Sequence, residues 1–357
     1  MSQRDIKTKI VCTIGPASRR RETLAAMIEA GMDVARLNFA HGTFDEHAAT
    51  IADIRAAAQA SGRRVVVLAD LPGPKLRIGH LAEQQIELTR GHAFTLAVGD
   101  FTGDATRVST TFRNLPQVVQ PGDTIFLNDG LVQLVVERVS GDAVQCRVAV
   151  GGPLRSHKGI NLPDLELGTS AFTARDRECL AFALEHGVDA VGQSFVESAD
   201  DVHAVREAAS AAGRDIPVFA KIERARALQR IDEILAAADG IMVARGDLGV
   251  EIPIESIAIV QKELLRKANQ AGKPAITATQ MLLSMVENRR PTRAEVTDVA
   301  NAILDGTDYV MLSEESAVGA YPVDAVRMLS RIAKVTEPYM QSRVAPALPS
   351  SAPVGGN

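Results

Sequence analysis

The chain has 357 residues, of which 46% are hydrophobic and 23% charged, as in an ordinary folded domain protein. A formal net charge of −5 argues against a general nucleic-acid or membrane-surface binder, and no apolar run reaches the roughly 18 residues of a membrane span. No apolar signal-peptide core follows the N-terminus, and the 3 cysteines are widely spaced without a CxxC pair. These features predict a cytoplasmic protein with reduced thiols and about two domains.

Eight short apolar runs recur along the chain, and amphipathic helical patterns follow most of them. Continuous apolar strands joined by helices predict a parallel sheet that is covered on both faces. Eight such units favour an α/β fold of the (β/α)8 TIM-barrel type, although periodicity alone does not exclude a doubly wound open sheet. The runs are KIVCTIG (9–15), DVARLNFA (33–40), RRVVVLAD (63–70), AVGQSF (190–195), PVFAKIE (217–223), GIMVARG (240–246), PAITATQ (274–280) and YVMLSEE (309–315).

Between residues 73 and 168 the pattern changes to short alternating runs punctuated by Gly, Asp and Pro, without a long amphipathic helix. This predicts a small all-β domain inserted after the third barrel strand. There it lies at the catalytic end of the barrel, so we expect a lid over the site, with a decorative insertion as the alternative. The predicted barrel is 1–72 and 169–340, the inserted β-barrel domain is 73–168, and the Pro/Ser/Gly-rich tail 341–357 is expected to be disordered.

Charged side chains gather at the ends of the predicted strands. Strand alternation places Lys221 and Glu223 on one face, and Arg36 and Asn38 on another. Asp247 follows the sixth strand, so Glu223 and Asp247 together offer two carboxylates to a hard cation such as Mg²⁺. If both strand pairs face the mouth of a barrel, two cations and the carboxylates share one pocket.

Two small residues complete this pattern. Gly246 allows a backbone N–H to approach an anion closely, and Thr279 offers a hydroxyl at the end of the seventh strand. Each signal alone is commonly structural: KIE at a surface, GD in a turn, Thr at a helix cap. Together they indicate chemistry on a phosphorylated or carboxylated small molecule. The sequence contains neither GxxxxGK[ST] nor GxGxxG, so any nucleotide is bound without a Walker or Rossmann loop.

Long blocks of the sequence, in the same order, closely resemble the pyruvate kinase family from Lys7 to about Tyr339. The resemblance implies phosphoryl transfer from phosphoenolpyruvate to ADP, giving pyruvate and ATP, with Mg²⁺. The most specific blocks are MVARGDLG and the PTRAE…DVANA run. The matching segments are TKIVCTIGPAS (8–18), ARLNFAHGTFDEH (35–47), HKGINLP (157–163), KIE (221–223), IMVARGDLGVEIP (241–253), KPAITATQML (273–282) and PTRAEVTDVANAILDGTDYVMLSEESAVGAYP (291–322).

The resemblance also implies roles for individual residues. Lys221 matches the lysine that stabilises the transferring phosphoryl group and the enolate oxygen, and Arg36 matches the arginine on the phosphoryl group. Glu223 and Asp247 match the Mg²⁺ ligands. Thr279 matches the position that delivers a proton to the enolate, so Lys221, Thr279 and Arg36 are the expected catalytic residues.

Two further groups match substrate-binding positions. The amides of Gly246 and Asp247, with the Thr279 hydroxyl, match the cradle of the substrate carboxylate. The residues on the nucleotide side are Asn38, His41, Arg77 and Lys158.

One group of positions departs from the family pattern. The family holds K⁺ with side chains of NFSHG and DTKGPEIR, where this chain has NFAHG and DLPGPKLR. Asn38 and Asp70 remain, Ala40 and Leu71 lack hydroxyls, and Lys75 replaces the glutamate. We therefore predict that the Lys75 ammonium substitutes for K⁺ and that the enzyme is K⁺-independent. Neutral drift at the hinge of the lid is the alternative.

The C-terminal part also differs. SEES (313–316) replaces the commoner SGET, so that Glu315 keeps the family carboxylate and Glu314 adds a second, for which we expect a solvated rim position. The chain ends about 18 residues after Tyr339, where the family usually continues with an allosteric domain. We expect a short form without that domain, which argues against a homotetramer and leaves a homodimer through the barrel.

Two other functions remain open from the sequence. A Mg²⁺-dependent lyase or aldolase of the phosphoenolpyruvate/pyruvate barrels shares the carboxylate–metal–enolate chemistry but does not need the inserted domain. An inactive regulatory paralogue is the non-enzymatic alternative, which the presence of Lys221, Glu223, Asp247 and Thr279 disfavours.

Overall fold

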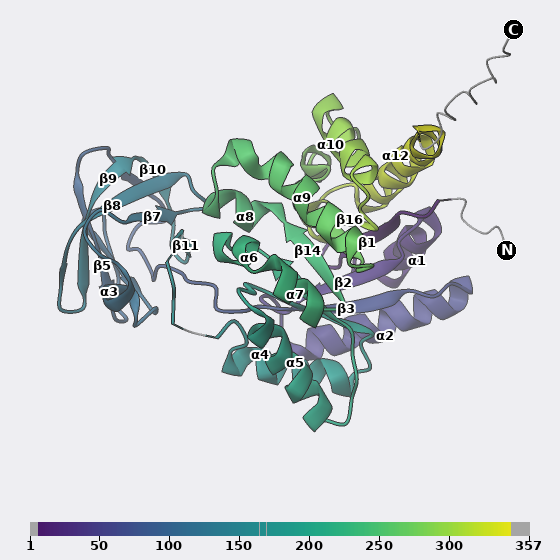
Figure 1. Cartoon of the computed structure of the whole chain (residues 1–357), viewed down its shortest axis with the longest axis horizontal. Coiled ribbons are helices and arrows are strands. Elements are labelled where there is room, and N and C mark those ends of the chain that lie inside the picture. The colour runs from purple at the N-terminus through teal and green to yellow at the C-terminus, as the bar shows by residue number, and fades with distance from the viewer. Residues whose placement is uncertain (1–5, 164, 169, 344–357) are drawn as a thin grey trace, which may run out of the picture.

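The computed structural model describes residues 6–163, 165–168 and 170–343, and its centre is a closed barrel of eight parallel strands (Figure 1). The strands are β1 (Lys9–Thr13), β2 (Val34–Asn38), β3 (Val66–Leu71), β12 (Ala190–Gln193), β13 (Val218–Ile222), β14 (Gly240–Ala244), β15 (Ala275–Ala278) and β16 (Tyr309–Leu312). Their order round the barrel is β1-β16-β15-β14-β13-β12-β3-β2, and β1 pairs with both β2 and β16. This closure confirms the predicted TIM barrel and excludes the open sheet.

The barrel strands are apolar on both faces because each face is buried against a different layer. Leu68, Met242 and Ile276 pack on one another inside the barrel. Ile10 and Val67 point outward and pack against the helices. Burial on both sides explains why the sequence shows continuous apolar runs rather than alternation.

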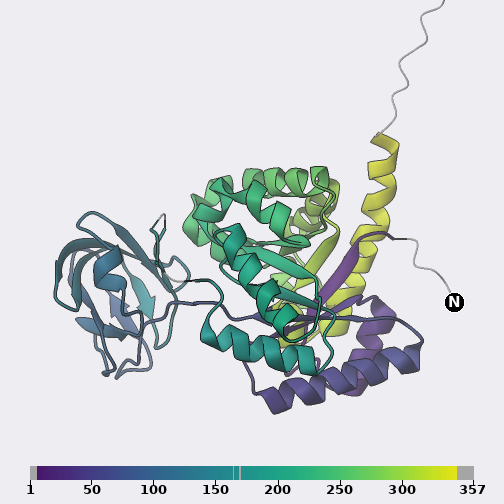
Figure 2. The ribbon, with the colours of Figure 1, turned by 60° about the horizontal axis from the view of Figure 1, so that its bottom comes forward.

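Helices surround the barrel on its outer face (Figures 1 and 2). Thr43, Thr173 and Thr292 begin three of them with capping boxes, in which the Thr hydroxyl and a carboxylate three residues later satisfy the first backbone N–H groups. The helices are α1 (Arg21–Ala30), α2 (Phe44–Ser61), α4 (Ala174–Glu185), α5 (Ala199–Ala211), α6 (Ala225–Gln229), α7 (Ile231–Ala237), α8 (Arg245–Glu251), α9 (Ile257–Gln270), α10 (Arg293–Leu304), α11 (Glu314–Ala317) and α12 (Pro322–Arg343), with short 3-10 turns η1 (Ile254–Ser256) and η2 (Leu283–Val286).

A second lobe lies between β3 and α4 in the chain, and two extended segments join it to the barrel (Figure 2). We call this lobe the β-domain. It has its own hydrophobic core, which includes Phe94, Leu96 and Leu134. The predicted β insertion after the third strand is thus confirmed, although the domain also contains a short helix at Leu115–Val118 and is not purely β. A six-stranded sheet has the order β11-β7-β8-β9-β5-β6, and β10 pairs with β4. These elements are β4 (Ile86–Leu88), β5 (Ala93–Val98), β6 (Arg107–Thr110), α3 (Leu115–Val118), β7 (Thr124–Leu127), β8 (Val132–Ser140), β9 (Ala143–Val150), β10 (Gly152–Leu154) and β11 (Ile160–Asn161).

The C-terminal helix is longer than the sequence suggested. Helix α12 runs to Arg343, so residues 341–343, which belong to the predicted disordered tail, are helical. The rest of that predicted tail, 344–357, lies outside the described residues. Among the described helices, none combines the length and the apolar character that crossing a membrane requires.

Candidate active site

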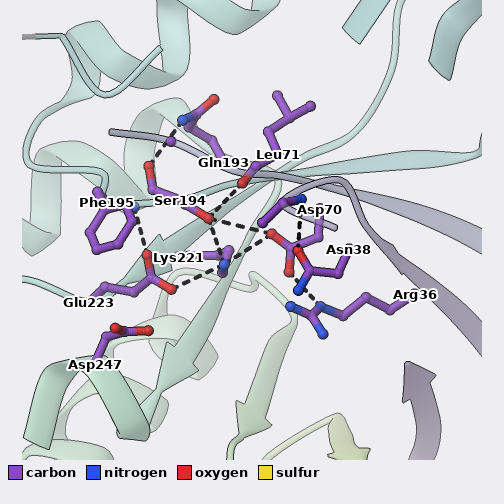
Figure 3. Close-up of polar contacts among 12 residues, drawn as sticks. Arg36, Asn38, Asp70, Leu71, Gln193, Ser194, Phe195, Lys221, Glu223 and Asp247 are labelled. Carbon is purple, nitrogen blue, oxygen red and sulfur yellow. Dashed lines mark hydrogen bonds and ion pairs between the residues drawn. The ribbon is translucent and has the colours of Figure 1, made fainter. Parts of the chain in front are cut away.

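Lys221 lies at the centre of a polar cluster at the carboxyl ends of the barrel strands (Figure 3). Its Nζ is 2.9 Å from Asp70 Oδ1 and 3.0 Å from Glu223 Oε1, and it donates a 2.6 Å hydrogen bond to Ser194 Oγ. The Lys221 side chain is only 8% exposed. Strand alternation at the end of β13 thus brings Lys221 and Glu223 together. Ser194 directly follows β12, the neighbour of β13, and Asp70 lies on β3, the next strand round the barrel.

Asp70 is shared between two cations. Arg36 Nε donates to Asp70 Oδ2 at 2.5 Å, while Lys221 contacts the other oxygen. A second nitrogen of Arg36, Nη1, donates to Thr13 Oγ1 at 2.7 Å. The carboxylate therefore fixes both cationic side chains on the same side of the pocket.

The protonation states follow from these contacts. Burial alone would lower the pKa of Lys221, but the Asp70 and Glu223 carboxylates outweigh it and raise that pKa above the ordinary value. Burial alone would raise the pKa of Asp70, but Arg36 and Lys221 hold it below its usual range. At neutral pH the site therefore contains an ammonium, a guanidinium and an ionised aspartate.

Glu223 and Asp247 form a pair of carboxylates beside this cluster (Figure 3). Glu223 is 2% exposed, and its Oε2 accepts a 2.8 Å hydrogen bond from the backbone N–H of Phe195. Burial and the charges of Asp247 and Asp70 raise the pKa of Glu223 by more than Lys221 lowers it. A buried carboxylate held beside a second carboxylate is suited to a divalent cation, whose positive charge would offset both the burial of Glu223 and the repulsion from Asp247.

The protein itself offers few ligands for such a cation. Within the described ranges no group of three or more His, Cys, Asp or Glu side chains is arranged to hold a metal ion. Glu223 and Asp247 alone suit Mg²⁺, which typically takes one or two carboxylates and completes its shell with water and substrate oxygens.

Lys75 contacts the second of these carboxylates. Its Nζ is 3.1 Å from Asp247 Oδ1, and both side chains are about one third exposed, at 35% and 29%. The expected remnant of a K⁺ site lies elsewhere: Asn38 and Asp70 are register partners on β2 and β3, and Asn38 Oδ1 accepts a hydrogen bond from the N–H of Ala40. The structure thus pairs Lys75 with the predicted metal ligand and not with Asp70.

The predicted carboxylate cradle is brought together by two adjacent strands. Gly246 and Asp247 belong to the first turn of α8, and Thr279 directly follows β15. A Cβ at Gly246 would lie 2.6 Å from Thr279 Cγ2, so only glycine fits against this threonine. The backbone amides and the hydroxyl therefore share one small space.

The four predicted nucleotide-side residues are divided between the two lobes. Asn38 and His41 line a barrel-side cavity of about 510 Å³, together with Pro16 and other residues. Arg77 and Lys158 belong to the β-domain, where Arg77 Nη1 donates to the His157 carbonyl at 2.9 Å and Lys158 Nζ lies 3.8 Å from Asp129. A ligand held by all four residues has to bridge the barrel and the β-domain.

Sequence reasoning missed two residues that contact the cations of the site. Ser194 Oγ accepts a hydrogen bond from the Lys221 ammonium, and Thr13 Oγ1 accepts one from the Arg36 guanidinium. Ser194 directly follows β12 and Thr13 ends β1, so their positions at strand ends could have been read from the sequence. Glu315 is fully buried and accepts the N–H groups of Leu282 and Ser313 at 2.9 and 2.8 Å, so its role is to hold two loops. Glu314 is exposed, as expected of a rim charge.

Comparisons with known proteins agree with this geometry. The family model described as "Pyruvate kinase, barrel domain" matches residues 5–326. A pyruvate kinase of Thermococcus litoralis is 55% identical over 336 residues, 94% of this chain and 71% of the relative. A pyruvate kinase of Mycobacterium tuberculosis H37Rv is 50% identical over 324 residues, 91% of this chain and 69% of the relative, and one of Corynebacterium glutamicum is 46% identical over 93% and 70%. None of these matches supports the lyase or the inactive paralogue.

Proposed function

The chain belongs to the pyruvate kinase family, and from this premise we propose that the pocket around Lys221 transfers a phosphoryl group from phosphoenolpyruvate to ADP, giving pyruvate and ATP. The observation that supports this pocket most strongly is the buried Lys221 ammonium, held between Asp70 and Glu223 at the mouth of the barrel. Phosphoryl transfer depends mainly on alignment and on offsetting charge, and this pocket supplies both.

Each cation of the pocket has a separate task in the proposed reaction. Lys221 and Arg36 offset negative charge on the transferring phosphoryl group, and Lys221 also faces the oxygen that becomes the enolate. Asp70 keeps both side chains in place because each of its oxygens accepts one of them. This fixed arrangement needs no reorganisation when charge develops, which is what makes electrostatic stabilisation effective.

Glu223 and Asp247 are the proposed holders of Mg²⁺, which when bound neutralises charge on the substrate oxygens. The amides of Gly246 and Asp247 and the Thr279 hydroxyl bind the substrate carboxylate. We also assign to the Thr279 hydroxyl the position from which the enolate carbon receives its proton after transfer, by way of a water molecule that supplies the proton. Asn38, His41, Arg77 and Lys158 are the proposed contacts of the nucleotide.

One assay tests the proposed function against its alternatives. Purified protein is given phosphoenolpyruvate, Mg²⁺ and ADP, and pyruvate and ATP are both measured. We expect equimolar pyruvate and ATP, and no pyruvate without ADP. Pyruvate release that is independent of ADP would instead favour a lyase, and a protein that produces neither compound under these conditions is not a pyruvate kinase.

We further propose that this enzyme does not require K⁺. Ala40 and Leu71 provide no hydroxyl ligands, both oxygens of Asp70 already accept cationic side chains, and Lys75 places a fixed ammonium against Asp247. Activity in a tetramethylammonium buffer free of K⁺ should therefore equal activity with added K⁺. Lys75→Glu should lose activity and regain only part of it with K⁺; a strong K⁺ requirement of the unaltered protein contradicts the proposal.

A further inference from the structure

The loop that carries Thr279 has an unfavourable backbone. Thr279 has φ 71° and Gln280 has φ 55°, so two consecutive non-glycine residues adopt the left-handed region. For a β-branched residue this conformation is a genuine outlier, and it persists only where surrounding contacts enforce it. Something in the structure must therefore hold this turn.

Arg245 supplies those contacts from the neighbouring strand end. It directly follows β14, and its Nε donates to the Ala278 carbonyl at 3.0 Å, while Nη2 donates to the Thr279 carbonyl at 2.8 Å. One planar guanidinium thus binds the carbonyls of the two successive peptide units that flank the Thr279 Cα, which is where the strained turn begins. A fork of fixed geometry fixes the orientation of both carbonyls at once.

The guanidinium is itself held in place. Nη1 donates to Asp298 Oδ1 of α10 at 2.7 Å and to Gln261 Oε1 of α9 at 3.3 Å. The Arg245 side chain is 14% exposed, and each of its three nitrogens donates to a protein acceptor. These acceptors belong to α9, α10 and the end of β15, whereas Arg36 and Lys221 share Asp70 as their acceptor in the pocket.

Gly246 confines the side chain of Thr279, because a Cβ added at residue 246 would lie only 2.6 Å from Thr279 Cγ2. Consecutive residues of one strand end, Arg245 and Gly246, thus fix the carbonyl and the side chain of Thr279. We propose that Arg245 is a positioning residue that holds Thr279 in its strained conformation, so that the hydroxyl meets the substrate carboxylate and the enolate. This inference rests on the proposed function for the role of Thr279.

A double-mutant cycle in the whole chain tests the inference. Arg245→Lys keeps the charge, but a single ammonium cannot bind two carbonyls and Asp298 in a plane. We expect kcat/KM for phosphoenolpyruvate to fall about 100-fold, since misplacement by about 1 Å typically has that cost, while KM for ADP changes less than about twofold. Thr279→Ala removes the group being positioned, so adding Arg245→Lys to Thr279→Ala should cost little more.

The matched control is Arg206→Lys. Arg206 also donates to a carbonyl, that of Ala237 at 3.1 Å, and to a carboxylate, that of Asp239 at 2.6 Å, but Asp239 precedes β14 at the other end of the strands. The inference is wrong if Arg245→Lys behaves like Arg206→Lys, or if the losses of Arg245→Lys and Thr279→Ala multiply. Should Arg245→Lys fail to fold, Asp298→Asn provides the second variant, with a smaller loss in the same parameter.

A structure of the Arg245→Lys protein provides a readout that does not depend on activity. We expect Thr279 to leave the left-handed region or to occupy two conformations. If Thr279 keeps its φ near 71° without the guanidinium, the inference is overturned even when the enzyme is active. Failure of the unaltered chain to make ATP would contradict the proposed function alone, because the backbone of Thr279 can still be compared between the two structures.

Discussion

Asp70 is the residue on which the cationic half of the pocket depends. It is 1% exposed and accepts hydrogen bonds from both Arg36 and Lys221. Removal of a buried counter-charge leaves uncompensated cations in a dry site, which costs far more than removal of an exposed ion pair.

Asp70→Asn should therefore change the pH dependence of the reaction. Lys221 loses a carboxylate that raises its pKa, while burial continues to lower that pKa. The ammonium then deprotonates at a lower pH, so the alkaline fall of kcat/KM should begin earlier than in the unaltered enzyme; pH–rate profiles measure this. We also expect Asp70→Asn to lower the free energy of unfolding by about 3–5 kcal/mol. Asp53→Asn, which removes the exposed ion pair with Arg21, should lower it by less than about 1 kcal/mol. An unmoved alkaline limb contradicts this prediction.

Metal binding should depend on pH through Glu223. Burial raises the pKa of Glu223, and a bound divalent cation must displace its proton. Below that pKa the apparent Kd for Mn²⁺, a spectroscopic substitute for Mg²⁺, should rise by about tenfold for each pH unit. Titrations followed by electron paramagnetic resonance check this, and Glu223→Gln should bind weakly without that dependence. A chelator should abolish ATP formation, and added Mg²⁺ should restore it.

Whether a contact of the site could be predicted from the sequence depends on how far apart its two residues are in the chain. The Lys221–Glu223 pair follows from strand alternation, and the sequence predicted it without a structure. Lys75 and Asp247 are 172 residues apart, and Lys75 lies on a connection without regular structure, so no periodicity places its ammonium. The same limit hid Arg245, three of whose acceptors come from the next strand–helix unit, β15 and α10.

At the scale of elements, the start of α10 shows how a loop of the site is tied to a helix. Glu295 closes the capping box with Thr292 and also accepts hydrogen bonds from the N–H and the hydroxyl of Ser284 in η2. Partial burial alone would raise the pKa of Glu295, but the hydrogen bonds from Ser284 and Thr292 lower it. The ionised carboxylate therefore stabilises both elements.

Glu295→Ala should lower the free energy of unfolding by about 1–2 kcal/mol at neutral pH, since a cap and a loop contact are lost. A carboxylate with a depressed pKa stabilises the fold above its unfolded pKa, and this stabilisation disappears as the pH falls through the folded value. The difference between variant and parent in denaturant unfolding should therefore shrink below about pH 4. Glu263→Ala, at an exposed position of α9, is the control; an equal loss in both variants contradicts the prediction.

The barrel strands were predictable because they are continuous apolar runs with helices between them. In the β-domain the alternating runs predicted β4, β5, β7, β8 and β9, but no run predicted β6, β10, β11 or α3. The runs are QIELTRG (85–91), AFTLAVGD (93–100), DTIFLNDG (123–130), LVQLVVERVSG (131–141) and AVQCRVAVGG (143–152). Strands β10 and β11 have 3 and 2 residues, and they exist because they pair with β4 and β7, which lie far away in the chain. Local pattern cannot report such pairing.

At the scale of the whole molecule, the nucleotide-side residues lie on two lobes. Lys158→Ala in the β-domain should raise KM for ADP about tenfold, through loss of one phosphate contact, and should leave KM for phosphoenolpyruvate nearly unchanged. Steady-state kinetics with each substrate varied separately check this. Arg138→Ala, which alters an exposed contact with Gln145 in the same domain, should change neither constant. If Lys158→Ala raises KM for ADP and KM for phosphoenolpyruvate equally, the assignment of Lys158 to the nucleotide is wrong.

Hydrogen bonds connect the barrel with the β-domain and with the two segments that join them. Arg224 donates to the carbonyl of Leu165 at 3.0 Å, and Asn161 donates to Glu251 at 3.2 Å. The segment leading into the β-domain is tied as well, because the N–H of Gly73 donates to Asp176 at 2.8 Å. Both connections are thus anchored on the barrel, and Asn161, which lies on β11, also ties the sheet of the β-domain to it.

The charges around Lys221 have a consequence for the order in which ligands bind. Three cations (Arg36, Lys75 and Lys221) stand against three carboxylates (Asp70, Glu223 and Asp247), so the site by itself is electrically balanced. A dication arriving alone meets three positive side chains, and a phosphorylated acid arriving alone meets three negative ones. Each ligand offsets charges that repel the other, so we expect a divalent cation and phosphoenolpyruvate to tighten each other's binding. Linkage then makes the factor the same for both ligands.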